Sequence, residues 1–386
     1  MKKGAVRMYT LDREEETSWW SKCFTSGRPR LSRLQLNHSK EVSMERVYYI
    51  GLDIHKKTIS YCMKLHDGAV VGRGVIATER RALWQWLNKI PGPWKGAMEA
   101  TMFTGWIYDF LKPHALELKV AHPEMLKAIT AAKKKNDRDD AEKIADLLRV
   151  NLLPECHMAS EEIRQLRRVL RYRNMIVRTS VKMKNKISGL LMEVGASYNK
   201  KRLHGKKYFN TLLERVEDVP PSVNELLKLS RSGLEMFQGV QRKLLDTLHD
   251  NALIRERVRR LMSIDGIGEV TALTWVLEIG DFGRFSSVRQ VISYCGLCSA
   301  QNESAGKEQR GPISKKRNKH LQTVLIEAAK LAPRWNQHLA GIHARELKRG
   351  NHNRATLAVA RKLVTYMFAV ERRQREFRKE PVLEAA

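Results

Sequence analysis

Four acidic residues stand where the sequence pattern predicts the ends of regular elements. Asp53 and Glu99 close two predicted strands, while Asp137 and Asp140 stand three residues apart at the start of a predicted helix and so share one of its faces. Converging carboxylates repel one another unless a cation lies between them, and Mg²⁺ prefers such hard oxygen ligands. The pattern therefore predicts a Mg²⁺ site that could clamp a phosphodiester.

Each of these acids also has a plain structural interpretation. An aspartate at a strand end is commonly a turn or cap residue, and Asp137 has a suitable position to cap its own helix. Asp139 competes with Asp140 for the inward-facing position. The spacing alone leaves these alternatives open.

The elements that would position the four acids alternate between strands and helices. Apolar and β-branched runs with intervening turn residues predict strands, whereas apolar spacings of three and four predict helices. The predicted strands are 47–54, 58–65, 69–77, 94–99 and 116–121, and the predicted helices are 79–90, 102–111 and 137–150. This order is that of an α/β ribonuclease H-like domain, in which the acids can converge at one edge of the sheet.

A second candidate for chemistry is Ser304, which lies in a segment of small residues flanked by cations. A serine can attack a phosphodiester if a metal or a base activates it, although an isolated serine in a loop is usually a turn residue. Nearby, Cys295 and Cys298 form a Cys-x-x-Cys pair, but no second ligand pair at zinc spacing accompanies it. We therefore interpret the cysteine pair as incidental.

The turn Gly266-Ile267-Gly268 precedes a predicted helix and is similar to a helix–hairpin–helix signature. Such a turn can direct backbone N–H groups at a nucleic-acid phosphate without reading sequence. An ordinary tight turn between packed helices is the alternative. Gly266 and Gly268 are therefore candidate phosphate-binding positions.

The charge balance points to a polyanionic partner. The chain has 386 residues, with 71 Lys and Arg against 42 Asp and Glu, and a formal net charge of +29. Residues 161–210 hold 14 basic and 3 acidic residues, and residues 345–379 hold 11 and 3. A solvated helix face is the alternative. The predicted nucleic-acid-binding side chains are Lys182, Lys184, Lys186, Lys315, Lys316 and Arg317.

The domain organisation follows from changes in these patterns. Residues 1–45 are predicted to be a flexible extension, 46–155 the α/β domain, and 156–262 a helical coiled-coil stalk with apolar spacings of three, four and seven. A small, mainly helical domain at 263–335 carries Ser304, and a basic helical tail occupies 336–386.

Several function classes are disfavoured. No apolar run reaches the length of a membrane span, no secretory pattern opens the chain, and five scattered cysteines predict a reducing compartment rather than a disulfide scaffold. No phosphate-binding G-x-x-x-x-G-K-[ST] motif is present, which argues against an ATP-driven motor.

Three blocks of sequence resemble the DEDD-type transposases of bacterial insertion sequences, whose characterised members are bridge-RNA-guided recombinases. The first block contains Ile50-Gly51-Leu52-Asp53-Ile54-His55-Lys56 and Met98-Glu99-Ala100-Thr101, and the second is Lys135-Asn136-Asp137-Arg138-Asp139-Asp140-Ala141. The third runs from Gly266-Ile267-Gly268 through Ile279-Gly280-Asp281-Phe282, Phe285, Gly296-Leu297 and Ser304 to Leu321.

The resemblance implies a RuvC-like domain whose metal ligands are Asp53, Glu99, Asp137 and Asp140, and a C-terminal domain whose Ser304 is the nucleophile. It also implies DNA and a guide RNA as partners, a dimer or tetramer, and a location at the bacterial nucleoid in the cytoplasm. The chain departs from the family at two points. Glu303-Ser304-Ala305-Gly306 replaces the usual Ser-Ser-Gly, and Met102 replaces a glycine that often follows the threonine.

Taken together, these features favour a transposase that attacks DNA with Ser304 while the acidic cluster assists. A RuvC-like nuclease that uses metal-activated water is the first alternative, and a non-catalytic nucleic-acid-binding protein is the second. A serine mechanism conserves the energy of the broken bond in a covalent link, which agrees with the missing ATP motif.

Overall fold

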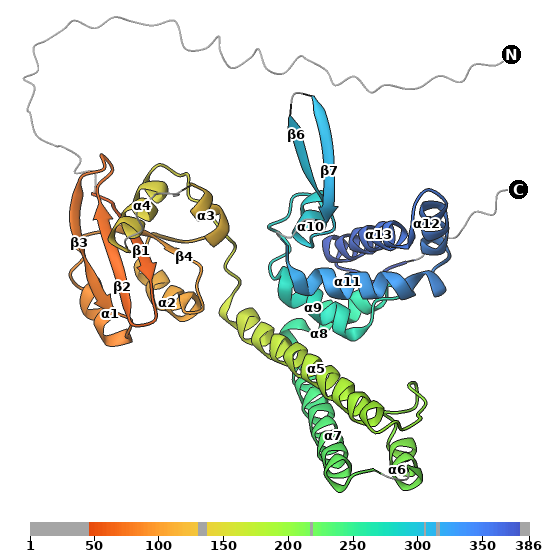
Figure 1. Ribbon diagram of the computed structural model, residues 1–386. Coiled ribbons are helices and arrows are strands. Elements are labelled where there is room, and N and C mark those ends of the chain that lie inside the picture. The colour runs from red at the N-terminus through yellow and green to blue at the C-terminus, as the bar shows by residue number, and fades with distance from the viewer. Residues whose placement is uncertain (1–45, 130–136, 217–218, 305, 314–316, 379–386) are drawn as a thin grey trace, which may run out of the picture. The chain divides into compact units, whose positions relative to one another are not determined.

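The computed structural model describes residues 46–129, 137–216, 219–304, 306–313 and 317–378. The predicted extension at 1–45 lies outside the described residues. Within the described part, the chain begins with an α/β region, continues into two long helices and ends in a mainly helical region (Figure 1). The domain boundaries remain a prediction, so each region is treated through its own contacts.

The α/β region contains a five-stranded mixed sheet in the order β3-β2-β1-β4-β5. Antiparallel pairing joins β1 to β2 and β2 to β3, whereas β1, β4 and β5 run parallel. The strands are β1 (Tyr48–Ile54), β2 (Thr58–Lys64), β3 (Val70–Ala77), β4 (Trp94–Glu99) and β5 (Glu117–Ala121). This arrangement agrees with the predicted order of a ribonuclease H-like domain.

Helices cover both faces of this sheet. Helices α1 (Arg80–Leu87) and α2 (Thr104–Leu111) bury their apolar residues with Ile50 and Leu52 of β1 in one core. Helix α4 (Asp137–Arg149) packs on the other face, together with the seven-residue helix α3 (Pro123–Ile129). The sequence did not predict α3, because so short a helix has too few turns to show an apolar period.

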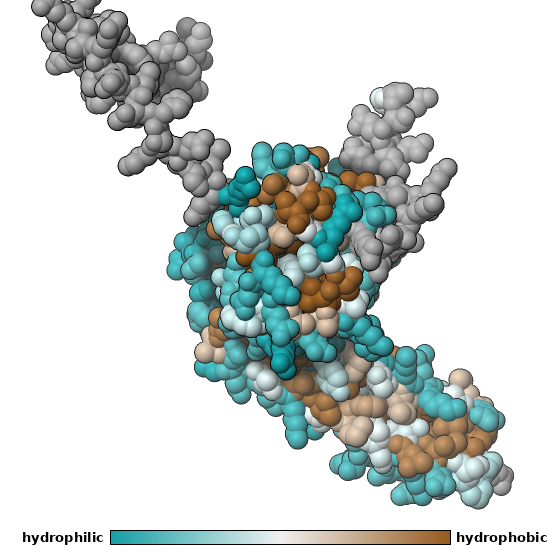
Figure 2. All heavy atoms as spheres, turned by 90° about the vertical axis from the view of Figure 1, so that its left-hand side faces the viewer, coloured by the Kyte–Doolittle hydropathy of each residue, from teal (hydrophilic) through white to brown (hydrophobic). Residues whose placement is uncertain are grey.

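Two long helices follow, as the apolar spacing predicts. Helix α5 (Glu161–Glu193) begins at Ser160, whose hydroxyl accepts a hydrogen bond from the backbone N–H of Ile163, and it packs along α7 (Pro221–His249). A short helix that the sequence did not predict, α6 (Lys206–Arg215), joins their shared core through Phe209. The helices also expose large apolar side chains such as Met192 and Leu229, and brown patches appear in the lower part of Figure 2.

The C-terminal region is built around α9 (Glu269–Ile279). Every residue of this helix from Ala272 to Ile279 is buried, Trp275 among them, so α9 is covered on all sides. The surrounding helices are α8 (Ala252–Met262), α10 (Val288–Tyr294), α11 (Lys319–Leu331), α12 (Gln337–Lys348) and α13 (His352–Arg373). Although its composition is basic, α13 adds Leu363 and Met367 to this core. Its apolar stripe rather than its charge decides that packing.

A β-hairpin projects from this helical region and is a feature that the sequence did not predict. It consists of β6 (Ser299–Ser304) and β7 (Lys307–Ile313), which pair antiparallel. The expectation of a serine in a loop is therefore corrected: Ser304 is the last residue of a strand. Polar side chains and a proline give this segment little of the β-branched alternation by which strands are recognised.

Candidate active site and nucleic-acid interface

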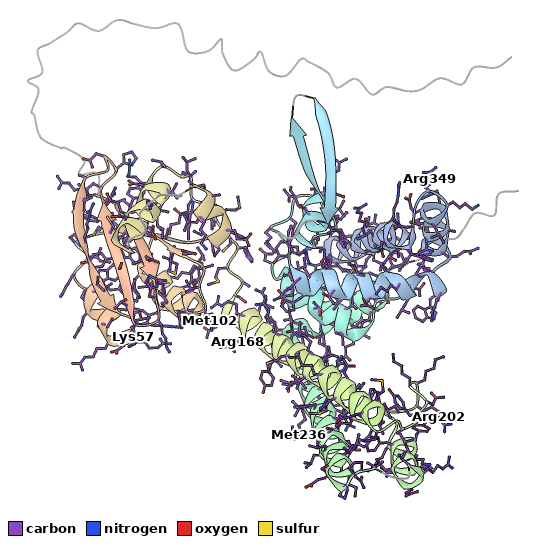
Figure 3. All side chains as sticks on the ribbon, in the orientation of Figure 1. Lys57, Met102, Arg168, Arg202, Met236 and Arg349 are labelled. Carbon is purple, nitrogen blue, oxygen red and sulfur yellow. The ribbon has the colours of Figure 1, made fainter. Side chains whose placement is uncertain are left out.

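Asp53 and Glu99 lie beside each other at one edge of the five-stranded sheet. Strands β1 and β4 are parallel neighbours whose register pairs Leu52 with Met98, and each acid is the next residue along its strand. The loops that follow the two strands contain Lys57 and Met102, which Figure 3 labels at the same edge. Two acids that are 46 positions apart in the chain are therefore brought together by strand pairing.

Both acids point to the face of the sheet that α4 covers. Side chains alternate along a strand, and Gly51 and Ala97, each two residues before an acid, face α4. A Cβ atom at Gly51 would lie 2.1 Å from the carbonyl oxygen of Ala141, so only glycine permits this contact. The close approach brings the first turn of α4 next to the strand that carries Asp53.

The remaining two predicted ligands belong to that first turn. Asp137 is the first residue of α4, but its side chain lies outside the described part of the structure. Asp140 is half-buried and pairs with Lys143, with 3.2 Å between Oδ1 and Nζ. Among the described side chains, a set that omits Asp137, no group of three or more His, Cys, Asp or Glu residues could hold a metal ion.

A buried cation fixes the position of α4 on the sheet. Lys64 of β2 is 5% exposed, and its Nζ lies 2.6 Å from Oδ2 of Asp146 and 2.9 Å from Oε1 of Glu142. Arg73 of β3 pairs with the other oxygen of Glu142 at 2.5 Å. Burial favours a lower pKa for Lys64, but the hydrogen bonds and charges of Asp146 and Glu142 outweigh it and raise the pKa. Lys64 therefore stays charged and ties β2 to α4, while Arg73 ties β3 to the same helix.

Two further residues contact the strand ends directly. Nε2 of His55 lies 3.1 Å from Oδ2 of Asp53, whose side chain is largely buried. The hydroxyl of Thr104, which is 3% exposed, donates to the backbone carbonyl of Glu99 at 3.0 Å and accepts from the N–H of Thr101. Sequence reasoning missed the role of Thr104, because its position after the strand carries no motif.

Ser304 belongs to the separate two-stranded sheet and is paired in register with Lys307 across the hairpin. The turn between them contains Gly306 at φ +74°, a conformation that suits glycine. The Ser304 side chain lies outside the described side chains, so its contacts are not part of the site's geometry. The backbone places Ser304 at the end of β6, in a different sheet from the strands that carry Asp53 and Glu99.

A buried anion joins α5, α9 and the N-terminus of α11, the helix that follows the hairpin in the sequence. Glu278 of α9 is 1% exposed and accepts two hydrogen bonds from Arg171 of α5, at 2.8 and 2.9 Å. Its Oε2 also accepts from the side-chain amide of Asn318 at 2.9 Å, and Asn318 caps the N-terminus of α11. Burial favours a raised pKa for Glu278, but Arg171, followed by Asn318 and Arg167, lowers it. Glu278 therefore stays ionised.

The two glycines of the predicted phosphate-binding turn have different structural roles. Gly266 has φ +88°, and a Cβ atom there would lie 2.5 Å from Cβ of Ala332. Packing against the end of α11 therefore explains this glycine without a ligand. Gly268 is the N-cap of α9 and has open space around it. The N-terminus of α9 at Gly268 is therefore open, and Gly268 remains a candidate phosphate-binding position.

The predicted basic contacts are distributed over several elements. Lys182 and Lys186 are exposed on α5 and Lys184 is half-buried there, while Arg317 is exposed before α11. Lys315 and Lys316 lie outside the described residues. Figure 3 labels further basic side chains on α5, after α5 and after α12, namely Arg168, Arg202 and Arg349.

The Cys-x-x-Cys pair includes one buried thiol, that of Cys295. Cys295 and Cys298 are free cysteines, and burial raises the pKa of the Cys295 thiol. A thiol that resists ionisation is a poor nucleophile and a poor metal ligand. This agrees with the interpretation of the Cys-x-x-Cys spacing as incidental.

Two family models match separate segments of this chain. A family model of DEDD transposases matches residues 50–195, and a model described as "Transposase IS116/IS110/IS902 family" matches residues 258–344. The first match contains all four acids, and the second contains Ser304. The matched segments leave out residues 196–257, which include all of α6 and α7.

Three curated relatives are similar over most of their length. The transposase for insertion sequence element IS1111A of Coxiella burnetii is 26% identical over 90% of this chain and 96% of its own. A probable family 20 transposase of Pseudomonas aeruginosa is 24% identical over 85% of this chain and 98% of its own. The transposase for insertion sequence element IS1328 of Yersinia enterocolitica is 26% identical over 85% and 97%.

These findings define an insertion-sequence transposase, an enzyme that cuts and recombines DNA. Within that class, the chain belongs to the IS116/IS110/IS902 family. The interpretation as a non-catalytic nucleic-acid-binding protein is thereby set aside. Within the described residues, no helix is both long enough and apolar enough to cross a membrane.

Proposed function

We propose that this transposase moves an insertion sequence by serine attack on DNA, with Ser304 as nucleophile and the four acids as the metal site. The observation that carries the proposal is the parallel pairing of β1 with β4, which sets Asp53 beside Glu99 on the face covered by α4. The helix that packs there begins at Asp137. If Asp137 and Asp140 join Asp53 and Glu99 at that end of the sheet, the four carboxylates would repel one another, and a bound cation would relieve the repulsion.

The donor set suits a hard divalent cation such as Mg²⁺, because all four side chains offer carboxylate oxygens and none offers sulfur or nitrogen. Asp53, Glu99, Asp137 and Asp140 would hold it. When bound, the ion stabilises negative charge on the attacking and leaving oxygens of a phosphodiester. Lys64 and Gly51 would serve this site indirectly, because Lys64 holds α4 against β2 and Gly51 lets α4 approach β1.

The proposed transfer of the phosphate to serine needs no ATP. The Ser304 hydroxyl oxygen bonds to the phosphorus and gives up its proton, the bond from phosphorus to the 3′ oxygen breaks, and that oxygen leaves as a 3′ hydroxyl. The product is a 5′-phosphoserine link, which a second 3′ hydroxyl can attack to restore a DNA strand and free the serine.

We further propose that a guide RNA and a homo-oligomer complete the enzyme, and that the protein works at the bacterial nucleoid. The exposed cations of α5 support a polyanionic partner, because an α-helix with Lys182 and Lys186 on its surface attracts phosphates. Guidance by RNA would let base pairing choose the site. Sequencing RNA that copurifies with the protein tests this part.

The decisive experiment compares Ser304→Ala with Asp53→Asn on DNA that carries the insertion-sequence ends. Serine attack predicts that Ser304→Ala abolishes both cleavage and the protein–DNA adduct that survives denaturation. Asp53→Asn should slow cleavage by about 10²–10³-fold, as loss of a group that stabilises transition-state charge does. Ser299→Ala, at the other end of β6, and Asp67→Asn, in an exposed turn, are matched controls.

The outcomes separate the serine mechanism from its alternative. If Ser304→Ala keeps cleaving while Asp53→Asn does not, the enzyme uses water and the serine proposal is wrong. If Asp53→Asn cleaves like the wild type, the metal-site assignment is wrong. A steep fall of DNA binding with rising salt is expected in every variant, because phosphate contacts release counterions.

A further inference from the structure

A cavity of about 660 Å³ lies in the C-terminal region, outside the proposed active site. Its walls come from α8, from the loop of residues 280–286 that follows α9, and from the C-terminal end of α13. This loop contains the motif Gly280-Asp281-Phe282 with Phe285, which has no part in the proposed cutting of DNA. The volume lies within the range of pockets that hold small organic ligands.

One side of the cavity is aromatic. Phe282, Phe285 and Phe368 all line it, although each is also half-buried against the core. The rings of Phe282 and Phe368 are 4.9 Å apart between centroids. Phenylalanine faces that remain at a cavity wall offer a flat apolar surface on which a planar ligand can stack.

The frame of the cavity is rigid before any ligand binds. Arg257 donates to both carboxylate oxygens of the buried Glu371, at 2.8 and 3.2 Å, and to the carbonyl of Gly280 at 3.1 Å. The indole N–H of Trp275 donates to the same Glu371 at 3.2 Å. Arg284 stacks over the ring of Phe285, 4.1 Å from its centroid. A pocket whose side chains already hold their positions loses little conformational entropy when a ligand binds.

The charge that remains at the cavity is positive. Glu371 neutralises Arg257, but Arg260 has a long ion pair of 3.5 Å to Glu256, and Arg372 is an exposed cation at the wall. The loop adds one carboxylate, Asp281, of which Oδ1 already accepts the backbone N–H of Gly283. The cavity thus offers a stacking wall, two cations and one hydrogen-bond acceptor.

We propose that this cavity binds one unpaired nucleotide of a single-stranded nucleic acid. The base stacks on Phe282 and Phe285, and its phosphate lies on Arg260 and Arg372. Asp281 accepts a hydrogen bond from an exocyclic amino group, which makes cytosine a better ligand than uracil. A base inside a duplex is excluded, because its faces are already covered by its neighbours.

The proposed ligand is a nucleotide, which either RNA or single-stranded DNA could provide. Fluorescence anisotropy with the full-length protein compares twelve-nucleotide oligomers of ribocytidine, ribouridine and deoxycytidine with a duplex of the same length. The ratio of ribocytidine to deoxycytidine affinity identifies the source. Wild-type protein should bind ribocytidine or deoxycytidine more tightly than ribouridine, and Asp281→Ala should remove that preference.

Neighbouring arginines provide the matched control. Arg372→Glu should weaken binding of the single strand about tenfold, whereas Arg373→Glu, which is equally exposed but does not line the cavity, should weaken it about twofold. Phe282→Leu keeps an apolar side chain but removes the flat face, and should weaken binding several-fold without changing the salt dependence. Thermal unfolding of each variant establishes that it is folded.

The proposal is overturned if Arg372→Glu and Arg373→Glu have equal effects, because the binding would then follow net charge alone. It is also overturned if a folded Phe282→Leu binds like the wild type. Asp53→Asn should slow cleavage, as the proposed function expects, while single-strand binding stays at the wild-type level. That variant therefore separates failure of this inference from failure of the proposed function.

Discussion

Two regions of this transposase each hold a buried ion that joins neighbouring elements, and the two ions have opposite signs. In the α/β region, the buried ammonium of Lys64 is held by Asp146 and Glu142. In the C-terminal region, the buried carboxylate of Glu278 is held by Arg171 and Asn318. Each ion keeps its charge because its partners outweigh the cost of burial.

The two buried ions differ in how many elements of the structure supply their partners. Both partners of Lys64 are four residues apart on one helix, so the cation fixes the position of α4 alone. The partners of Glu278 come from α5 and from the cap of α11, which are far apart in the sequence. Loss of Lys64 should therefore affect the position of α4 alone, whereas loss of Glu278 should affect the attachment of several elements at once.

The largest effect is expected from Glu278→Gln. The substitution keeps the shape but leaves Arg171 and Arg167 without a buried counter-charge, which should lower the free energy of unfolding by about 3 kcal/mol. Chemical denaturation followed by circular dichroism measures it. Glu235→Gln, which removes an exposed partner of Arg231, is the control and should cost less than 1 kcal/mol. If both variants lost the same free energy of unfolding, the buried ion pairs of Glu278 would contribute no more to stability than an exposed pair does.

Gly51→Ala should be the next most damaging change. The new methyl group would meet the backbone of α4, which must move away from β1, at a cost of about 2–3 kcal/mol. Because that shift displaces Asp137 and Asp140, cleavage should fall more than the loss of stability explains. Gly239→Ala in α7 has open space around the new atom and should instead stabilise the protein by about 1 kcal/mol. Normal cleavage by Gly51→Ala would contradict the proposed position of the acids.

Lys64→Met should destabilise the protein by about 2 kcal/mol, less than Glu278→Gln, because Glu142 and Asp146 are partly exposed and can regain water. Cleavage should require more Mg²⁺, since α4 loses its tie to β2. Lys95→Met, which breaks a surface pair with Glu117, is the control and should leave the Mg²⁺ dependence unchanged. A Mg²⁺ dependence that matches wild type in the Lys64 variant would restrict Lys64 to a purely structural role.

The smallest expected effect is the pH dependence of the stability that Glu278 contributes. The folded-state pKa of Glu278 is lowered, so its contribution is complete above the unfolded value of about 4.3 and is lost as the pH falls through the folded value. The stability difference between wild type and Glu278→Gln should therefore be constant from pH 5 to 7 and shrink below about pH 4. Denaturation at several pH values measures this, and a difference that grows on acidification would contradict the assigned charge.

Much of the acidic site could be predicted from the sequence because strand ends are marked by composition. The run before Asp53 and the run before Glu99 alternate in the way that strands do, and the structure has both as neighbouring parallel strands. Lys64 and Thr104 could not be found in this way. Their importance comes from partners far away in the chain, and no local pattern records them.

The hairpin that carries Ser304 shows the opposite situation. Its residues are polar and give no strand period, yet pairing between β6 and β7 satisfies their backbone groups. Glu278 stands within an apolar helix, where its sequence context suggests only a lone charge. Its role becomes visible through Arg171 and Asn318, which approach it from other elements.

By itself, the sequence determined the charge, the strand and helix periods and the identity of the acidic residues, because these depend on composition and local spacing. The tertiary structure decided which face of the sheet the acids share, why Gly51 and Gly266 must be glycines, and which buried charges hold the elements in place. Those features depend on contacts between residues that are distant in the chain, and such contacts exist only after folding.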